Sequence, residues 1–168
     1  VATAGDGSSD VTLTFTGGVE GNNTAVGYNA GISVTTSVAN TLIGSHAGDS
    51  ITVGNSNTAF GFSAGGGTTT GGNNTFIGSG AGVANVGGAS NICIGRDANL
   101  GGASFGNSIT IGTSITNNLG SNSVEIGNTS MTKFKTHGAM TNRAYTGTAE
   151  GGGIDASDAV SISVGEYN

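Results

Sequence analysis

One short phrase recurs at a fixed interval along the middle of the chain. Each copy ends in a glycine; the first six of these glycines are 17 residues apart, and a seventh follows after 15. Five equal steps in succession exceed what composition alone produces, even with 34 glycines in 168 residues. A fixed short period is typical of repeat architectures, in which each copy forms one stacked unit. The phrase-ending glycines are Gly27, Gly44, Gly61, Gly78, Gly95, Gly112 and Gly127.

The composition favours thin coils of β-structure. Only 8% of the residues are charged, 35% are hydrophobic, and there is no proline. Such a chain is too polar for a thick core, yet too uncharged and too regular for ordinary disorder. We therefore expect an all-β fold, a parallel β-roll (β-solenoid) with one coil per repeat. The array should span residues 22–130, with an N-terminal capping or pairing strand in 1–21 and a C-terminal β module or transition segment in 131–168.

The columns of the repeat predict which side chains point inward. Side chains alternate along a strand, so the positions one and three before each glycine share a face. The first is always large and apolar and the second is mostly β-branched, so we expect both inside the coil. The column between them should then face outward, although its first five members are apolar. An outward apolar stripe indicates an interface with partner chains, formed here by Ala25, Leu42, Ala59, Phe76 and Cys93.

Two further columns predict how each coil turns. An asparagine stands four residues before the glycine in five coils, where stacked amides can hydrogen-bond to one another and to the backbone of the turns. Three residues after the glycine an alanine recurs, often followed by glycine, which indicates a sharp corner with room only for small side chains. The asparagines are Asn23, Asn40, Asn57, Asn74 and Asn91, and the alanines are Ala30, Ala47, Ala64, Ala81 and Ala98.

Several function classes are disfavoured. The net charge is −6, and residues 1–132 contain a single basic side chain, Arg96, so we expect no nucleic-acid partner. No apolar run approaches transmembrane length, so we expect no membrane insertion. His46 and Asp49 are three residues apart, but one such pair is more typical of solvated polar side chains than of a catalytic site. We expect no enzyme activity, no metal site and no cofactor.

The residues directly after the repeat glycines include candidates for ligand binding. Tyr28 and Phe62, two coils apart, have the chemistry to stack on a sugar ring, and Arg96 the chemistry to pair with an acidic one. The alternative is that the three side chains pack between neighbouring chains.

The repeat resembles sequences of known attachment proteins. NSITIG (residues 107–112) and NSVEIG (122–127) are similar to the head repeats of YadA-type trimeric autotransporter adhesins, and NNTAVGYNA (22–30) resembles repeats of bacteriophage tail fibres. The resemblance implies a left-handed β-roll, a homotrimer, and attachment to a glycan or protein receptor on a host or cell surface. It also implies an extracellular location, on a virion tail fibre or a bacterial cell surface.

Two other functions stay open. The chain has features of a structural subunit of a self-assembling extracellular filament, with strands near residues 10–16 and 159–164 pairing between subunits. An ice-binding solenoid would use the column formed by Thr35, Thr52 and Thr69, but this column fails at Val86 and Ala103. We rank it last.

Overall fold

A computed structural model describes residues 22–130, together with the backbone of Leu13 and Thr14. The C-terminal module expected in 131–168, and all but those two residues of the segment expected in 1–21, lie outside the described residues. Within the described part there is no helix long and apolar enough to cross a membrane.

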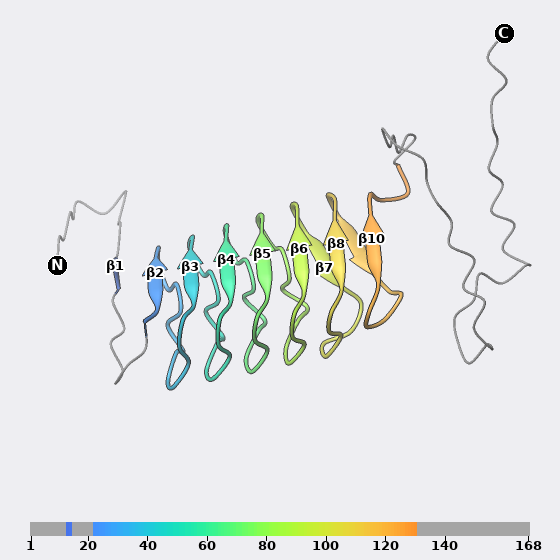
Figure 1. Cartoon of the computed structure of the whole chain (residues 1–168). Coiled ribbons are helices and arrows are strands. Elements are labelled where there is room, and N and C mark those ends of the chain that lie inside the picture. Colours follow the sequence, from blue (N-terminus) through green and yellow to red (C-terminus); the bar gives the residue numbers. More distant parts are fainter. Residues whose placement is uncertain (1–12, 15–21, 131–168) are drawn as a thin grey trace, which may run out of the picture. The chain divides into compact units, whose positions relative to one another are not determined.

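The described chain is a parallel β-solenoid of about six turns with about 17 residues per coil (Figure 1). Each coil contributes one three-residue strand to a sheet whose neighbours pair in parallel, so that Thr24 lies opposite Thr41 and Ala25 opposite Leu42. The strands of this sheet are β2 (Thr24–Val26), β3 (Thr41–Ile43), β4 (Thr58–Phe60), β5 (Thr75–Ile77), β6 (Ile92–Ile94), β8 (Ile109–Ile111) and β10 (Val124–Ile126). The all-β solenoid and the length of its coil are as predicted.

Two smaller pairings complete the β-structure of the described residues. The short strand β1 (Leu13–Thr14) pairs antiparallel with β2 at the start of the sheet. In the later coils β7 (Ala98–Leu100) and β9 (Ile115–Asn117) form a second, two-stranded parallel sheet. Among the described residues, these are the only strands that lie outside the main sheet.

A repeat glycine directly follows the last residue of each main-sheet strand, and no other residue type fits the backbone at this position. Gly61 has a φ of +137°, in the region that glycine adopts without steric cost. A Cβ added there would lie 2.7 Å from the backbone carbon of Gly78 in the next coil. The column is therefore held to glycine twice, once by its dihedral angle and once by the close stacking of successive coils.

The interior is filled by the middle residue of each strand, which corrects the orientation predicted from the sequence. Leu42, Phe76 and Cys93 are at most 1% exposed, whereas Phe60, one residue before its glycine, is 55% exposed. The column predicted to face partner chains is thus the core of its own chain, and the columns predicted to be inside face outward. The misplaced interface residues are Ala25, Leu42, Ala59, Phe76 and Cys93.

The physical reason for this reversal is the narrowness of the coil. From Ala25 to Phe76 the interior alternates small and large side chains, and each large one extends beneath the corner glycines of two coils. A Cβ on Gly48 would come within 2.8 Å of Leu42, and one on Gly65 within 2.7 Å of the Phe76 ring. The alanines of the predicted corner, where only small side chains were expected to fit, are buried: Ala30, Ala47, Ala64, Ala81 and Ala98.

The asparagine column forms a buried hydrogen-bonded ladder, as predicted. The Oδ1 atom of Asn57 accepts hydrogen bonds from the backbone N–H of Asn74 (3.1 Å) and from its Nδ2 (3.0 Å). Asn57 in turn donates through Nδ2 to Oδ1 of Asn40 (3.1 Å) and to the carbonyl of Gly71 (2.9 Å). Buried polar groups need hydrogen-bond partners, and this one side chain supplies partners to such groups in three coils.

Candidate interaction surfaces

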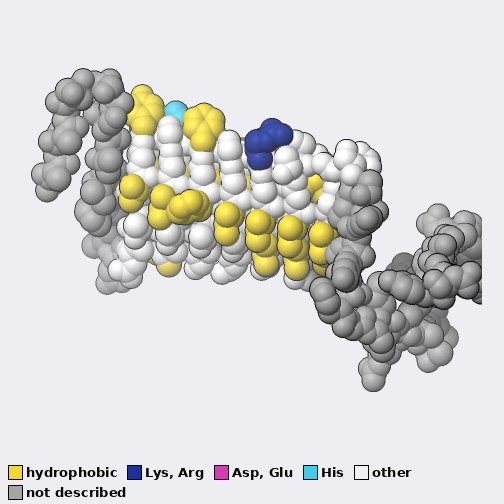
Figure 2. Space-filling view, turned by 90° about the horizontal axis from the view of Figure 1, so that it is seen from above, with side chains coloured by type: hydrophobic (Ala, Val, Ile, Leu, Met, Phe, Trp, Pro, Cys, Tyr) yellow, Lys and Arg dark blue, Asp and Glu magenta, His cyan; other side chains and the backbone are white. Residues whose placement is uncertain are grey.

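The outward face of the main sheet carries an uninterrupted apolar stripe, here called the outer stripe. Its members occupy the last position of each strand, and Figure 2 shows such a hydrophobic run along the length of the solenoid. Phe60 is 55% exposed, Ile77 39% and Ile126 41%. No charged residue occurs in this column. The outer stripe consists of Val26, Ile43, Phe60, Ile77, Ile94, Ile111 and Ile126.

The neighbouring outward column changes character along the solenoid. In the first four coils it holds threonines, such as Thr41 and Thr58. In the last three coils it is aliphatic, with Ile92, Ile109 and the well-exposed Val124. Both outward positions are therefore apolar from β6 onward, and the sheet face becomes more hydrophobic toward its C-terminal end.

A second exposed feature lies at the corner that follows each repeat glycine. Tyr28 and Phe62 are 59% and 58% exposed there, and the ring of His46 lies between them. The His46 ring meets Tyr28 edge-on at a centroid distance of 5.4 Å and Phe62 at 6.2 Å. We call Tyr28, His46 and Phe62 the aromatic edge; Figure 2 shows a histidine between two hydrophobic side chains along one long side.

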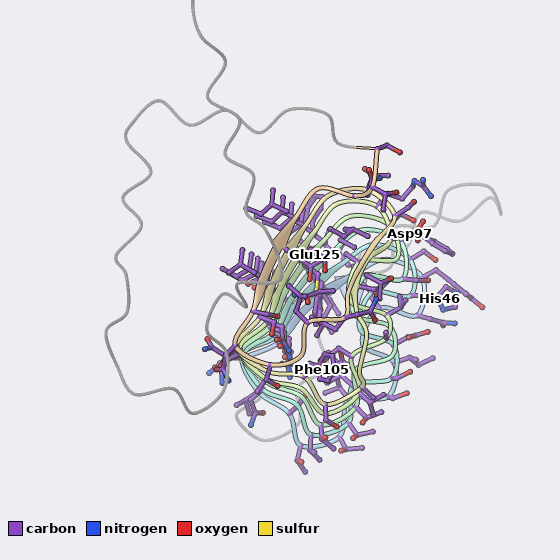
Figure 3. All side chains as sticks on the ribbon, turned by 90° about the vertical axis from the view of Figure 1, so that its right-hand side faces the viewer. His46, Asp97, Phe105 and Glu125 are labelled. Atoms are coloured by element: carbon purple, nitrogen blue, oxygen red, sulfur yellow. The ribbon has the colours of Figure 1, made fainter. Side chains whose placement is uncertain are left out.

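Backbone hydrogen bonds stack these corners directly upon one another. The N–H of His46 donates to the carbonyl of Tyr28 (2.7 Å), and that of Gly80 donates to Phe62 (2.9 Å). His46 has a φ of +59°, a left-handed conformation imposed by the corner. Its Nδ1 lies 3.1 Å from Oδ2 of Asp49, which fixes the ring. In Figure 3 His46 points away from the stacked strands, on the opposite side of the coil.

The structure brings together only two of the three predicted binding residues. Arg96 lies further along the same side, beyond a coil that presents Ser79 and Gly80 at this corner. Its guanidinium pairs with the carboxylate of Asp97 and donates to Oγ of Ser114 at 3.0 Å. Arg96 is therefore exposed but engaged by its own neighbours, and it does not join the aromatic edge.

Sequence reasoning missed His46 as a member of this site. The pair with Asp49 forms, but its effect is to hold the imidazole between two aromatic rings. The available signal was positional, since His46 stands in the single coil that separates Tyr28 from Phe62.

The Cys93 thiol and the threonine hydroxyls serve the solenoid's own structure. Burial raises the pKa of the Cys93 thiol from 9.0 to about 11, and the Thr110 hydroxyl offsets this only in part; the thiol is a core group. The hydroxyls of Thr35 and Thr52 donate to backbone carbonyls one coil on, at 2.9 and 3.3 Å. Among the described residues no three His, Cys, Asp or Glu side chains gather as a metal site would require.

Comparison of the chain with protein-family models, with curated proteins and with solved structures found no match in any of the three.

Proposed function

We propose that this chain is a non-enzymatic, homotrimeric module of a fibre or adhesin, coiled as a left-handed β-roll, that attaches to a host or cell surface outside the cell. The observation that carries the proposal is the outer stripe. Soluble monomers rarely expose a contiguous apolar patch of more than a few hundred Å². This stripe crosses every described coil and carries no charge.

Covering the stripe is energetically worthwhile. Moving a fully exposed aliphatic or aromatic side chain of this size out of water stabilises by about 1.5–3 kcal/mol. These side chains are already partly buried in the single chain, so each contributes a fraction of that amount. Ten such side chains occupy the two outward columns: Val26, Ile43, Phe60, Ile77, Ile92, Ile94, Ile109, Ile111, Val124 and Ile126.

A second copy of the same chain is the occupant that fits best. Its coils repeat at the same spacing, about 4.8 Å for stacked strands, so every coil of one chain can meet a coil of another in register. The two outward columns of each strand also suit a trimer. Each chain around a common axis has two neighbours, and one column is available for each.

A filament subunit is less well supported. Leu13 and Thr14 pair with β2 through one edge only, and β1 is the end strand of the described sheet, so this pairing does not oppose a filament. What favours the trimer is the outer stripe, which end-to-end pairing of subunits would leave in water.

The mass of the chain in solution tests the assembly. We expect gel filtration with light scattering to give three times the chain mass of 16.1 kDa. Ile94→Asp would place a charge in the covered stripe, and we expect it to yield folded single chains with unchanged β-type circular dichroism. Leu119→Asp, at a residue 68% exposed and off the stripe, is the matched control and should remain trimeric. A wild-type mass of one chain, or an Ile94→Asp variant that assembles as well as the wild type, would refute the proposal.

Attachment is tested separately, with labelled wild-type and Ile94→Asp chains on a panel of bacterial and animal cells. Multivalent display predicts saturable binding that weakens by 10²–10⁴-fold in the single-chain variant. Equal binding by both proteins, or binding to no cell type in the panel, would count against a role in multivalent attachment.

A further inference from the structure

We infer that the aromatic edge is a carbohydrate-stacking site that takes the apolar faces of neutral sugar rings. This inference names the receptor class for the proposed attachment function and rests on it for its biological setting. Its physical basis is independent, because all the side chains concerned belong to one chain and to three consecutive coils.

The exposure of the rings is the first step of the argument. The chain has only three tyrosines and six phenylalanines, and the solenoid buries Phe76 almost completely. Tyr28 and Phe62 instead leave more than half of their surface in water, away from the sheet face. An exposed aromatic face offers apolar contact at low conformational cost, while the tyrosine also keeps a hydroxyl for hydrogen bonding.

The rigidity of the rings is the second step. The edge-on contacts of His46 at 5.4 and 6.2 Å support both neighbouring rings, and the contact of Nδ1 with the Asp49 carboxylate at 3.1 Å holds the imidazole. The corners themselves are stacked by backbone hydrogen bonds. The platform is therefore ordered before any ligand arrives, which lowers the entropic cost of binding.

The shape and surroundings of the edge favour a sugar over a protein partner. A stable protein interface buries about 800 Å² on each side, whereas the aromatic edge is one side chain wide. Hydroxyl and carboxylate groups border it, contributed by Ser45, Ser63 and the partly exposed Asp49. Flat apolar faces flanked by hydrogen-bonding groups match a sugar ring, which has an apolar face and a rim of hydroxyls.

The charge pattern indicates neutral sugars. Residues 22–130 contain a single Lys or Arg, which is Arg96. It lies apart from the aromatic edge and pairs with Asp97. The charged group nearest the rings is the Asp49 carboxylate, which repels an acidic sugar and accepts hydrogen bonds from a neutral one. The edge also lies across the coil from the sheet face (Figure 3), so trimer formation leaves it open.

The test is titration of the full chain with a panel of free neutral oligosaccharides, namely chito-, cello-, malto- and galacto-oligosaccharides of three to six sugars. Binding is followed by NMR through the ring signals of Tyr28 and His46. We expect at least one member to bind and to shift these signals. Tyr28→Ala and Phe62→Ala should each weaken that binding about tenfold. Leu119→Ala, which removes an exposed side chain away from the edge, should bind like the wild type.

The same titration on Ile94→Asp separates this inference from the proposed assembly. Because the site lies within one chain, the single-chain variant should bind a free oligosaccharide with the wild-type dissociation constant. Failure of every panel member to bind a trimeric wild type at millimolar concentration would overturn the sugar assignment and leave the trimer standing. Binding that survives the Tyr28→Ala, Phe62→Ala double variant, or cell attachment unchanged after periodate oxidation of the cell-surface glycans, would overturn it as well.

Discussion

The asparagine ladder makes a quantitative prediction about a single side chain, Asn57. Asn57→Ala removes four hydrogen bonds, but two of the groups involved keep another partner. Oδ1 of Asn40 still accepts from the backbone N–H of Asn57 at 2.9 Å, and Nδ2 of Asn74 still donates to Gly88 at 2.9 Å. Two buried groups are left without a partner, the backbone N–H of Asn74 and the carbonyl of Gly71.

The expected loss follows from these two orphaned groups. Each buried unsatisfied group costs about 1–3 kcal/mol, so the free energy of unfolding should fall by about 2–6 kcal/mol. A water molecule entering the space left by the amide would move the result toward the lower end.

Urea unfolding provides the assay, carried out in the Ile94→Asp background so that dissociation of chains does not contribute. Asn118→Ala is the control, since Asn118 is exposed and its amide donates only to Thr116; a change within about 0.5 kcal/mol is expected there. If Asn57→Ala were as mild as Asn118→Ala, the ladder would not be a source of stability, and the reasoning from buried polar groups would be wrong for this solenoid.

Three further predictions concern the backbone and the core. Gly61→Ala should lower the melting temperature far more than Gly120→Ala, because a Cβ at Gly61 meets the next coil at 2.7 Å whereas one at Gly120 meets nothing within 4 Å; both carry a strain of about 1–3 kcal/mol from their positive φ. Ala39→Asn should raise the free energy of unfolding by up to about 1 kcal/mol in urea titrations, since Ala39 has a φ of +60° and asparagine, which tolerates this conformation better, occupies the column in several other coils. The raised pKa of Cys93 means that the folded state holds its thiol proton while the unfolded thiol ionises with a pKa of 9.0. The free energy of unfolding should therefore be constant below about pH 9 and fall by about 2–3 kcal/mol as the pH rises toward 11. Cys93→Ala should abolish that part of the pH dependence, and an identical loss in the variant would contradict the assignment.

The sequence was sufficient for the repeat, the parallel stacking and the asparagine ladder, because each is a periodic column whose chemistry has one structural solution. It was insufficient for the direction of the side chains. Phe60 and Phe76 are the same residue type in consecutive coils, yet one is 55% exposed and the other 1%. Both faces of these strands are apolar, so alternation predicts two faces without saying which is inside.

The interior is decided by tertiary space that a single strand does not reveal. Gly65 and Gly82 leave room beneath the corners for the ring of Phe76, and both glycines lie outside the strand that carries this ring. Only part of the aromatic edge could be predicted, again because side-chain placement depends on the tertiary structure. Tyr28 and Phe62 stand out as aromatic residues after a corner, but the contribution of His46 depends on a left-handed turn that places its ring between them.

The alternation of small and large core residues from Ala25 to Phe76 sets a minimum unit for changes in the length of this part of the solenoid. Removing one 17-residue repeat by recombination within the gene would stack Ala25 on Ala59 and leave a void, or Leu42 on Phe76 and force an overlap. Removing or duplicating two repeats together keeps each large side chain between small neighbours. In this alternating part of the array, viable length variants, natural or engineered, should therefore differ by pairs of coils, although the visible repeat in the sequence is a single one.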